Sequence, residues 1–393
     1  MSKTEIVIAA AQRTPLGAFQ GALSPLTAPQ LGACALKSAI EAAGIRAAEV
    51  EEVILGCVLP AGLGQAPARQ AAIAAGIPLA TPTTTVNKMC GSGLKTVMMA
   101  ADQIRAGSAA VVLAGGFESM TQAPYLLPKA RGGYRMGHGE VLDQMFYDGL
   151  QSPFDGKLMG CFAEATAARY GFTREQQDAF AAESVRRALA AQAQAFSAEI
   201  SPLTVKSRKG EVVLQRDETP GACDLTKIPT LRPAFAKDGT VTAASSSSIA
   251  DGAAALVVMS AQAAESRGVK PLARILAYAS HAQEPEWFTT APVGAIRKVL
   301  VALGWQADDV DLYEINEAFA AVTMAAMHEL HLDPARVNVN GGACALGHPL
   351  GATGARILTT LLHALRARGG KRGIAALCIG GGEAVAVAVE TIW

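Results

Sequence analysis

The same arrangement of strand-like and helical segments occurs twice in this chain, once in each half. In the first half, Cys90 precedes a helix with closely spaced glycines, and the strand that follows ends in Gly115 and Gly116. In the second half, His348 stands in the place of the cysteine, and the strand that follows ends in glycines at 380–382. This repetition predicts two related β-α-β halves, with the chemistry located where the ends of their strands meet.

Both halves alternate strand-like and helical segments, which predicts parallel strands with helices packed on their faces. The helices are indicated by apolar residues at helical spacing, and the strands by short apolar or β-branched runs. Strands are expected at 5–10, 53–56, 83–86, 109–113, 253–259, 272–278, 311–315, 337–339, 374–379 and 384–390, and helices at 28–43, 66–75, 94–105, 174–195, 293–303, 318–330 and 351–368.

The pattern is interrupted between residues 121 and 248, where prolines and glycines are frequent. One long helix is still expected there, with Thr173 as its N-cap and Gln176 three residues later. We interpret the region as an insertion that lies over the core and carries ligand-contact loops. The serines at 245–248 are expected to form an ordered approach to a ligand rather than a flexible linker. The predicted division is a first core half (1–120 with 249–270), a loop domain (121–248) and a second core half (271–393).

Charge and cysteine content exclude several classes of partner. The chain has 34 Lys and Arg and 34 Asp and Glu, so neither a nucleic acid nor an anionic membrane is an expected partner. Seven cysteines with no CxxC pair indicate reduced thiols in a cytosol-like compartment. No signal peptide and no apolar run of membrane-spanning length is visible, which predicts a soluble, cytoplasmic protein.

Cys90 is a candidate nucleophile. It lies within residues 87–93 (NKMCGSG), between the expected strand at 83–86 and the expected helix at 94–105. The unpaired N–H groups and the dipole at the start of a helix favour a thiolate over a thiol. The small residues after the cysteine allow a substrate to approach closely. The alternative is a small buried residue of the core.

Three residues of the second half have similar positions. Asn316 follows an apolar strand and can donate a hydrogen bond to an oxyanion, directly or by fixing a water. His348 precedes a helix and can take the thiol proton or stabilise the thiolate. Cys378, at a strand end, can act as acid and base, and the glycine N–H groups after it can line an oxyanion pocket. Considered singly, these residues could be a turn or N-cap asparagine, a capping histidine and a small core cysteine.

Together, these motifs resemble the thiolase family along essentially the whole chain. The resemblance implies an α/β fold, with a duplicated β-α-β core in a five-layered α-β-α-β-α arrangement and an inserted loop domain. It also implies an acyltransferase that cleaves 3-oxoacyl-CoA with coenzyme A, or runs the reverse Claisen condensation. The motifs appear in the family's order and spacing at residues 87–93, 115–120 with 123–125, 316–319, 338–342, 347–354 and 378–382.

The resemblance also implies a role for each of the reactive residues. Cys90 would be the acylated nucleophile, and His348 its activator. Asn316 would hold a water that forms one oxyanion hole with His348, and the N–H groups of Cys90 and Gly380 would form the second. Cys378 would shuttle the α-proton. No metal, flavin or nicotinamide is implied as a cofactor; coenzyme A and acyl-CoA are the substrates, and a ping-pong order is expected.

The substrate contacts implied by the resemblance depart from the family's pattern. Leu158 stands where many thiolases that act on acetoacetyl-CoA carry a histidine, which predicts acyl groups bulkier than acetyl. Phe288 stands where a methionine often lines the pantetheine tunnel, and Lys227 lies near the place of an arginine that often meets the CoA phosphates. The implied contacts are Ser247, Leu158, Met159, Phe235, Lys227, Phe288, Ala318 and Phe319.

Two other functions share some of these features. A ketoacyl synthase would have the same architecture and condensing chemistry, but that group typically uses two histidines beside its cysteine. Here Cys378 and Asn316 stand instead, which favours a thiolase. A non-catalytic acyl-CoA-binding relative would not need all four reactive residues.

Metal binding and assembly complete the expectations. His328 and His331 are i, i+3 on an expected helix, but no third ligand accompanies them, so we interpret them as a surface or helix-end pair. The family resemblance implies a homodimer or homotetramer, with residues 121–140 as a candidate assembly loop.

Overall fold

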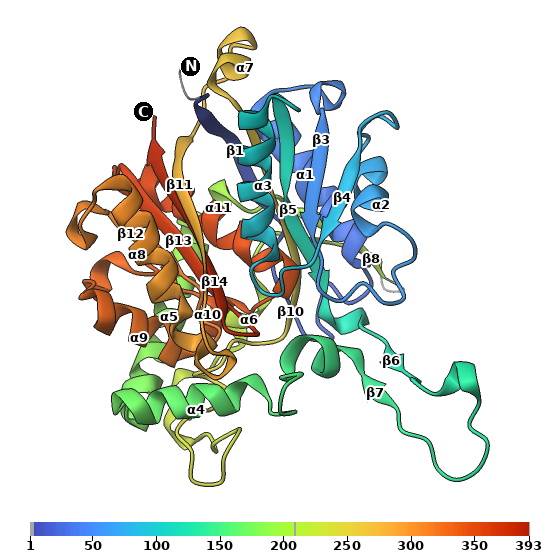
Figure 1. The fold of residues 1–393 in the computed structure, drawn as a ribbon, viewed down its shortest axis with the longest axis vertical. Helices are drawn as coiled ribbons and strands as arrows, with labels where there is room; N and C mark the ends of the chain where they lie inside the picture. Colours follow the sequence, from blue (N-terminus) through green and yellow to red (C-terminus); the bar gives the residue numbers. More distant parts are fainter. Residues whose placement is uncertain (1–3, 208–209, 393) are drawn as a thin grey trace.

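The computed structural model of the protein describes residues 4–207 and 210–392 (Figure 1). No helix within these ranges is long and apolar enough to cross a membrane. The helices are α1 (Ala28–Ala43), α2 (Pro67–Ala74), α3 (Ser92–Ala106), α4 (Met159–Tyr170), α5 (Arg174–Ala193), α6 (Glu218–Ala222), α7 (Ala261–Ser266), α8 (Ala291–Leu303), α9 (Ala320–Leu330), α10 (Ala343–Leu346) and α11 (Leu350–Arg368). The strands are β1 (Ile6–Arg13), β2 (Gly17–Ala18), β3 (Glu52–Gly56), β4 (Thr83–Val86), β5 (Val111–Ser119), β6 (Tyr125–Leu126), β7 (Leu142–Asp143), β8 (Leu203–Ser207), β9 (Gly210–Leu214), β10 (Ala250–Ser260), β11 (Ala273–Ala282), β12 (Leu312–Ile315), β13 (Arg372–Ile379) and β14 (Glu383–Thr391).

The main strands form two half-sheets of the same topology. They pair in the order β12-β13-β14-β11-β1-β10-β5-β3-β4, and the halves join where β1 pairs with β11. In the first half, β3 is parallel to β4 and β5, whereas β10 is antiparallel to β5 and β1. The second half repeats this pattern, with β12 parallel to β13, and β14 antiparallel to β13 and β11. The predicted duplication is confirmed.

The expectation of parallel strands is confirmed for only some of the pairs, because each half also includes antiparallel strands. β14 follows β13 through a short turn at residues 380–382. A turn of this length can join only antiparallel neighbours, since a parallel pair needs a long crossover.

The prediction of a strand at 337–339 is wrong. Only Val337 makes a bridge, to Tyr313, and Asn338 then takes a left-handed conformation with φ of 46°. The Asn338 side chain continues the pairing, because its amide group accepts from the N–H of Ile315 and donates to the carbonyl of Ile315, both at 2.8 Å. The other expected helices and strands are present, although several are longer than predicted.

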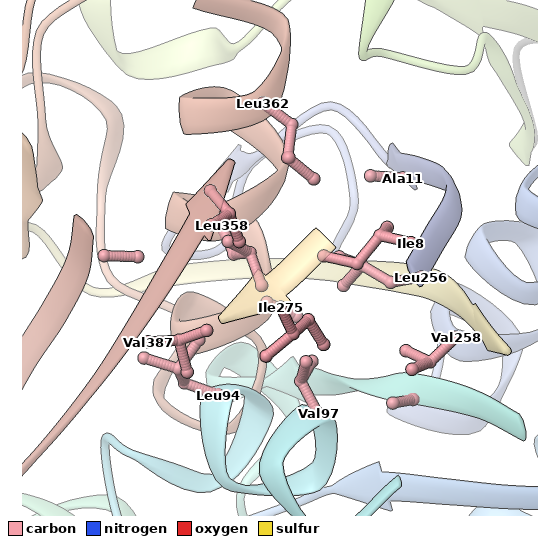
Figure 2. Close-up of a cluster of buried hydrophobic side chains, with 14 of the residues drawn as sticks. Ile8, Ala11, Leu94, Val97, Leu256, Val258, Ile275, Leu358, Leu362 and Val387 are labelled. Atoms are coloured by element: carbon pink, nitrogen blue, oxygen red, sulfur yellow. The ribbon is translucent and has the colours of Figure 1, made fainter. Parts of the chain in front are cut away.

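The elements stack in five layers. Helices α1 and α2 cover the outer face of the first half-sheet, α3 and α11 lie between the half-sheets, and α8 and α9 cover the outer face of the second (Figure 1). Figure 2 shows the central layer, where Leu94 and Val97 of α3 lie near Leu358 of α11, among side chains of both half-sheets such as Leu256 and Val387. The five-layered α-β-α-β-α arrangement implied by the resemblance is confirmed.

Two glycines allow α3 and α11 to touch backbone to backbone. A Cβ atom at Gly93 would lie 2.7 Å from the backbone nitrogen of Ala355. A Cβ atom at Gly354 would lie 2.8 Å from the Cβ of Leu94. Any side chain at either position would therefore push the helices apart at their N-terminal ends, where Cys90 and His348 lie.

Residues between β5 and β10 contain α4 to α6 and the short strands β6 to β9. The β6–β7 arm extends away from the core (Figure 1). Helix α5 begins with the expected capping box, because Thr173 Oγ1 accepts from the N–H of Gln176 at 3.2 Å and Gln176 Oε1 accepts from the N–H of Thr173 at 2.9 Å. The proposed division of the chain at residues 120, 249 and 271 stays a prediction.

The glycine contact predicts that Gly93→Ala destabilises the protein. Overpacking of a tight helix contact costs about 1–3 kcal/mol, and we expect the free energy of unfolding in urea to fall by about that amount. Gly221→Ala is the control, because a Cβ atom there meets no described atom within 4 Å. Equal stabilities of the two variants would contradict the role of the contact.

Candidate active site

Cys90 lies in a tight turn between β4 and α3. Met89 has a φ of 47°, and its N–H donates to Asn87 Oδ1 at 2.9 Å. The hydroxyl of Ser92 accepts from the N–H of Lys88 at 2.8 Å and donates to the carbonyl of Met89 at 2.6 Å. These bonds hold the left-handed residue next to the cysteine and so determine the direction of the thiol.

The pKa of the Cys90 thiol is raised to about 11, chiefly by burial. The N–H groups of Gly380 and Cys90 bond to the sulfur and lower the pKa, whereas the carboxylate of Glu118 raises it. Burial therefore outweighs the expected effect of the helix start, and the thiol is the favoured form of Cys90 near neutral pH. The N–H groups act in the expected direction, but the loss of solvation is larger.

His348 lies just before α11 and is held in one tautomer. Its Nδ1 is 2.6 Å from Thr353 Oγ1, and that hydroxyl donates to the carbonyl of Pro349 at 2.9 Å. Because the hydroxyl hydrogen is engaged, the oxygen accepts from Nδ1–H, and Nε2 carries the free lone pair. Burial and the charge of Arg356 lower the pKa of His348 to about 3, so the ring is neutral. Nε2 is buried and bonds to no other group of the described chain.

Asn316 and Cys378 lie at the ends of the adjacent strands β12 and β13. The N–H of Asn316 donates to the carbonyl of Ala376 at 3.0 Å, whereas the buried amide group of its side chain bonds to nothing within the described ranges. Cys378 is fully buried, and burial together with nearby Cys90 raises its pKa well above the usual value. The fold therefore brings the two predicted thiols and the N–H of Gly380 together.

A cavity of about 180 Å³ adjoins these residues and contains most of the expected substrate contacts. It is lined by Leu158, Met159, Phe235, Ser247, Phe319 and His348, together with Met120, Phe146, Leu150, Gly160, Ser246, Ser248, Ile249 and Leu350. A second cavity of about 470 Å³ shares Met159 and is lined by Gly380 and Met89. The expected contacts thus surround a space that lies between the two halves and the insertion.

An apolar cluster around Cys378 includes the expected contacts Phe288 and Ala318. The rings of Phe235 and Phe319 meet edge to face, with centroids 5.9 Å apart. The serine run is ordered as expected, because the N–H of Ser247 donates to the carbonyl of Ala318 at 3.0 Å.

Lys227 lies outside both cavities and outside the apolar cluster around Cys378. It lies on an exposed 3-10 turn (Leu225–Thr230), with Nζ 3.6 Å from a carboxylate oxygen of Asp224. It is not among the described residues that line either cavity.

Two buried carboxylates near the site were not identified from the sequence. Glu118, at the end of β5, accepts from the N–H groups of Val58, Leu59 and Gly351, and burial raises its pKa to about 7. Glu317 follows Asn316 and accepts from Ser184, Asn338 and Cys344; burial raises its pKa. An acidic residue at the end of an otherwise apolar strand was the available signal for Glu118.

Within residues 4–207 and 210–392, no group of three or more His, Cys, Asp and Glu side chains could hold a metal ion, and all seven cysteines are free. The ring of His328 meets that of Tyr170 edge to face at 5.6 Å, and His331 ends α9 in a left-handed conformation.

Known proteins and family models match this chain over nearly its whole length. The family models for the thiolase N-terminal and C-terminal domains match residues 6–262 and 269–391. A protein of Pseudomonas aeruginosa named acetyl-CoA acetyltransferase is 51% identical over 98% of both chains. One of the same name from Escherichia coli is also 51% identical, over 98% of this chain and 99% of its own. Among solved structures, the Bacillus anthracis acetyl-CoA acetyltransferase matches with a TM-score of 0.97 and 43% identity, over 99% of each chain.

The raised pKa predicts how alkylation of Cys90 depends on pH. Because the thiolate is the reactive form, and the pKa is about 11, the rate should rise about tenfold per pH unit from pH 7 to 10. Peptide mapping after iodoacetamide treatment measures this rate for each cysteine. For comparison, an unperturbed thiol stops gaining reactivity near its pKa of about 8.5. A plateau for Cys90 below pH 9 would contradict the raised pKa.

Proposed function

Because this chain belongs to the thiolase family, we propose that it catalyses the reversible, CoA-dependent cleavage of 3-oxoacyl-CoA. The products are acetyl-CoA and an acyl-CoA shortened by two carbons, and the reverse reaction is a Claisen condensation. The observation that carries the proposal is the convergence of Cys90, Cys378 and the Gly380 N–H beside a cavity that also contains His348.

The first half-reaction forms an acyl-enzyme. The Cys90 sulfur attacks the 3-keto carbon, and the thiol proton passes to Nε2 of His348, the ring nitrogen that carries the free lone pair. The bond between C2 and C3 then breaks, and its electron pair stays on C2. Cys378 gives its proton to C2, and acetyl-CoA leaves while the shortened acyl group remains on Cys90.

The second half-reaction restores the enzyme. The thiol of coenzyme A gives its proton to the Cys378 thiolate, and the CoA sulfur attacks the acyl group on Cys90. The shortened acyl-CoA leaves, and the Cys90 thiolate recovers its proton from His348. Each group regains a proton: Cys90 recovers its own through His348, and Cys378 takes the proton of the CoA thiol in place of the one that left in acetyl-CoA. The chemistry therefore needs only CoA and acyl-CoA as substrates and no bound cofactor.

Two hydrogen-bonding sites stabilise the charge that develops on oxygen. The N–H groups of Cys90 and Gly380 already point at the Cys90 sulfur, so they are near any oxygen on a carbon bonded to it. The unpartnered amide of Asn316 supports the proposal that it holds a water which, with His348, binds the second oxygen. Donors fixed in this way need no reorganisation during the reaction.

The proposal extends to assembly and compartment. We expect a homodimer or homotetramer in the cytoplasm, acting in fatty acid metabolism in the direction of β-oxidation or of synthesis. Exposed apolar side chains on the arm around β6 and β7, among them Tyr125, Leu127 and Met136, support residues 121–140 as an assembly loop.

Intact-protein mass spectrometry tests the acyl-enzyme. After mixing with a 3-oxoacyl-CoA, the wild type should gain the mass of the shortened acyl group, and added CoA should remove it. Cys90→Ala should form no adduct, whereas Cys34→Ala, which removes a half-buried thiol of α1, should behave as the wild type. Retained ligand with neither adduct nor turnover would instead support an acyl-CoA-binding relative.

The apolar lining around Leu158 predicts a preference for acyl chains longer than acetyl. In a series from acetoacetyl-CoA upward, kcat/KM should be highest for a longer substrate. Leu158→Ala should shift the optimum further, by about tenfold in the ratio of long to short substrates, since one methylene in an apolar pocket changes specificity 10- to 200-fold (about 1–3 kcal/mol). Leu79→Ala, at an exposed site, should leave the series unchanged. A kcat/KM that is clearly highest for acetoacetyl-CoA would contradict the predicted preference for longer acyl chains.

A further inference from the structure

Glu118 is a fully buried carboxylate that is surrounded by hydrogen-bond donors. Its Oε2 accepts from the N–H of Val58 at 2.9 Å and of Gly351 at 2.8 Å. Its Oε1 accepts from the N–H of Leu59 at 3.1 Å and faces the thiol of Cys57 at 3.6 Å. These groups come from two separate parts of the chain, the segment after β3 and the first turn of α11.

The bond to Gly351 holds the start of α11, three residues after His348. This turn leaves no room for a side chain at Gly351, because a Cβ atom there would lie 2.8 Å from Glu118 Oε2 and 2.9 Å from the Cα of Cys57. A Cβ atom at Gly56 would likewise lie 2.8 Å from the carbonyl oxygen of Gly351. The carboxylate therefore holds the backbone that carries the catalytic histidine against the strand ends of the first half.

The bond to Val58 leads to the turn that carries Cys90. The side-chain amide of Asn87 donates to the carbonyl of Val58 at 3.4 Å, and Asn87 Oδ1 accepts from the N–H of Met89 at 2.9 Å. Val58 also packs in the apolar cluster against which Cys90 lies. A chain of hydrogen bonds thus runs from the cysteine turn through Asn87, Val58 and Glu118 to the first turn of α11.

The duplication shows that Glu118 occupies the place of a catalytic group. Gly56 pairs with Gly116 in the first half, and Ile315 pairs with Ala376 in the second. Counting onward from these pairs, Cys57 corresponds to Asn316, and Glu118 corresponds to Cys378. In the second half these positions carry the unpartnered amide of Asn316 and the thiol of Cys378 beside Cys90, whereas in the first half the Cys57 thiol and the Glu118 carboxylate are bonded to each other.

We propose that Glu118 is a positioning residue of the thiolase reaction, which holds the turn of Cys90 and the start of α11 at the mutual placement that proton transfer requires. The inference rests on the proposed function. The carboxylate form suits this role, because among the described residues its four partners all donate, and a proton on the carboxyl would face another donor. The other titratable groups that face it are Cys57, after β3, and Cys90, before α3.

Glu118→Gln is the direct test, because it keeps the size of the side chain but places an NH2 group against the N–H donors. We expect kcat to fall about 10- to 100-fold, since a misplacement of about 1 Å can cost a hundredfold, while KM stays within about twofold. Hydrogen exchange measured by mass spectrometry should become faster in both the 87–90 and the 348–353 peptides. Glu199→Gln, an equally buried carboxylate paired with Arg13, should lose stability without these two changes.

Asn87→Ala provides a second test if Glu118→Gln does not fold, because Asn87 is exposed and its loss cuts the same chain of bonds. It should speed exchange at 87–90 and lower kcat in the same direction. Wild-type kcat in the folded variant, or unchanged exchange in both peptides, overturns the inference. A wild type that forms no acyl-enzyme would instead overturn the proposed function, and the exchange measurement would still decide whether Glu118 holds the two segments.

Discussion

The contact between α3 and α11 is the constraint on which the rest of this structure depends. Each helix begins next to a candidate catalytic residue, Cys90 or His348, and each supplies a glycine, Gly93 or Gly354, where the two backbones meet. Because the helices lie between the two half-sheets, their contact also determines how the halves face each other. The core packing and the geometry of the active site are therefore set by the same few atoms.

Burial gives the site its electrostatic character. Burial raises the pKa of Cys90 to about 11 and lowers that of His348 to about 3, so both side chains are uncharged near neutral pH. In the proposed reaction, charge develops on oxygen close to N–H groups that already bond to the Cys90 sulfur. Preorganised donors of this kind stabilise a transition state more than the ground state, which is the condition for catalysis rather than mere binding.

The two halves share a topology, but the residues at their strand ends differ in their partners. The strand ends of the second half carry Asn316, whose side-chain amide has no partner among the described residues, and Cys378, which lies with the Gly380 N–H beside Cys90. At the corresponding positions of the first half, Cys57 and Glu118 are bonded to one another and to the first turn of α11. A repeated fold can thus keep one set of strand ends for chemistry and use the other to hold that chemistry in place.

Much of this architecture could be predicted from the sequence, because it depends on local patterns. The spacing of apolar residues located the helices, the capping box at Thr173 marked the start of α5, and the repeated glycine motifs indicated the duplication. The strand at 337–339 was wrongly predicted because its apolar pattern continues through Asn338, while the backbone there turns left-handed. The identity and order of the reactive residues, and their resemblance to a known family, were likewise properties of the sequence alone.

Only the tertiary structure decided the states and partners of these residues. They are the high pKa of Cys90, the tautomer of His348, the bonds of Glu118 and the separation of Lys227 from the cavity. The reason is physical, since a pKa and a hydrogen bond depend on which distant groups surround a side chain, and only the folded chain brings those groups together.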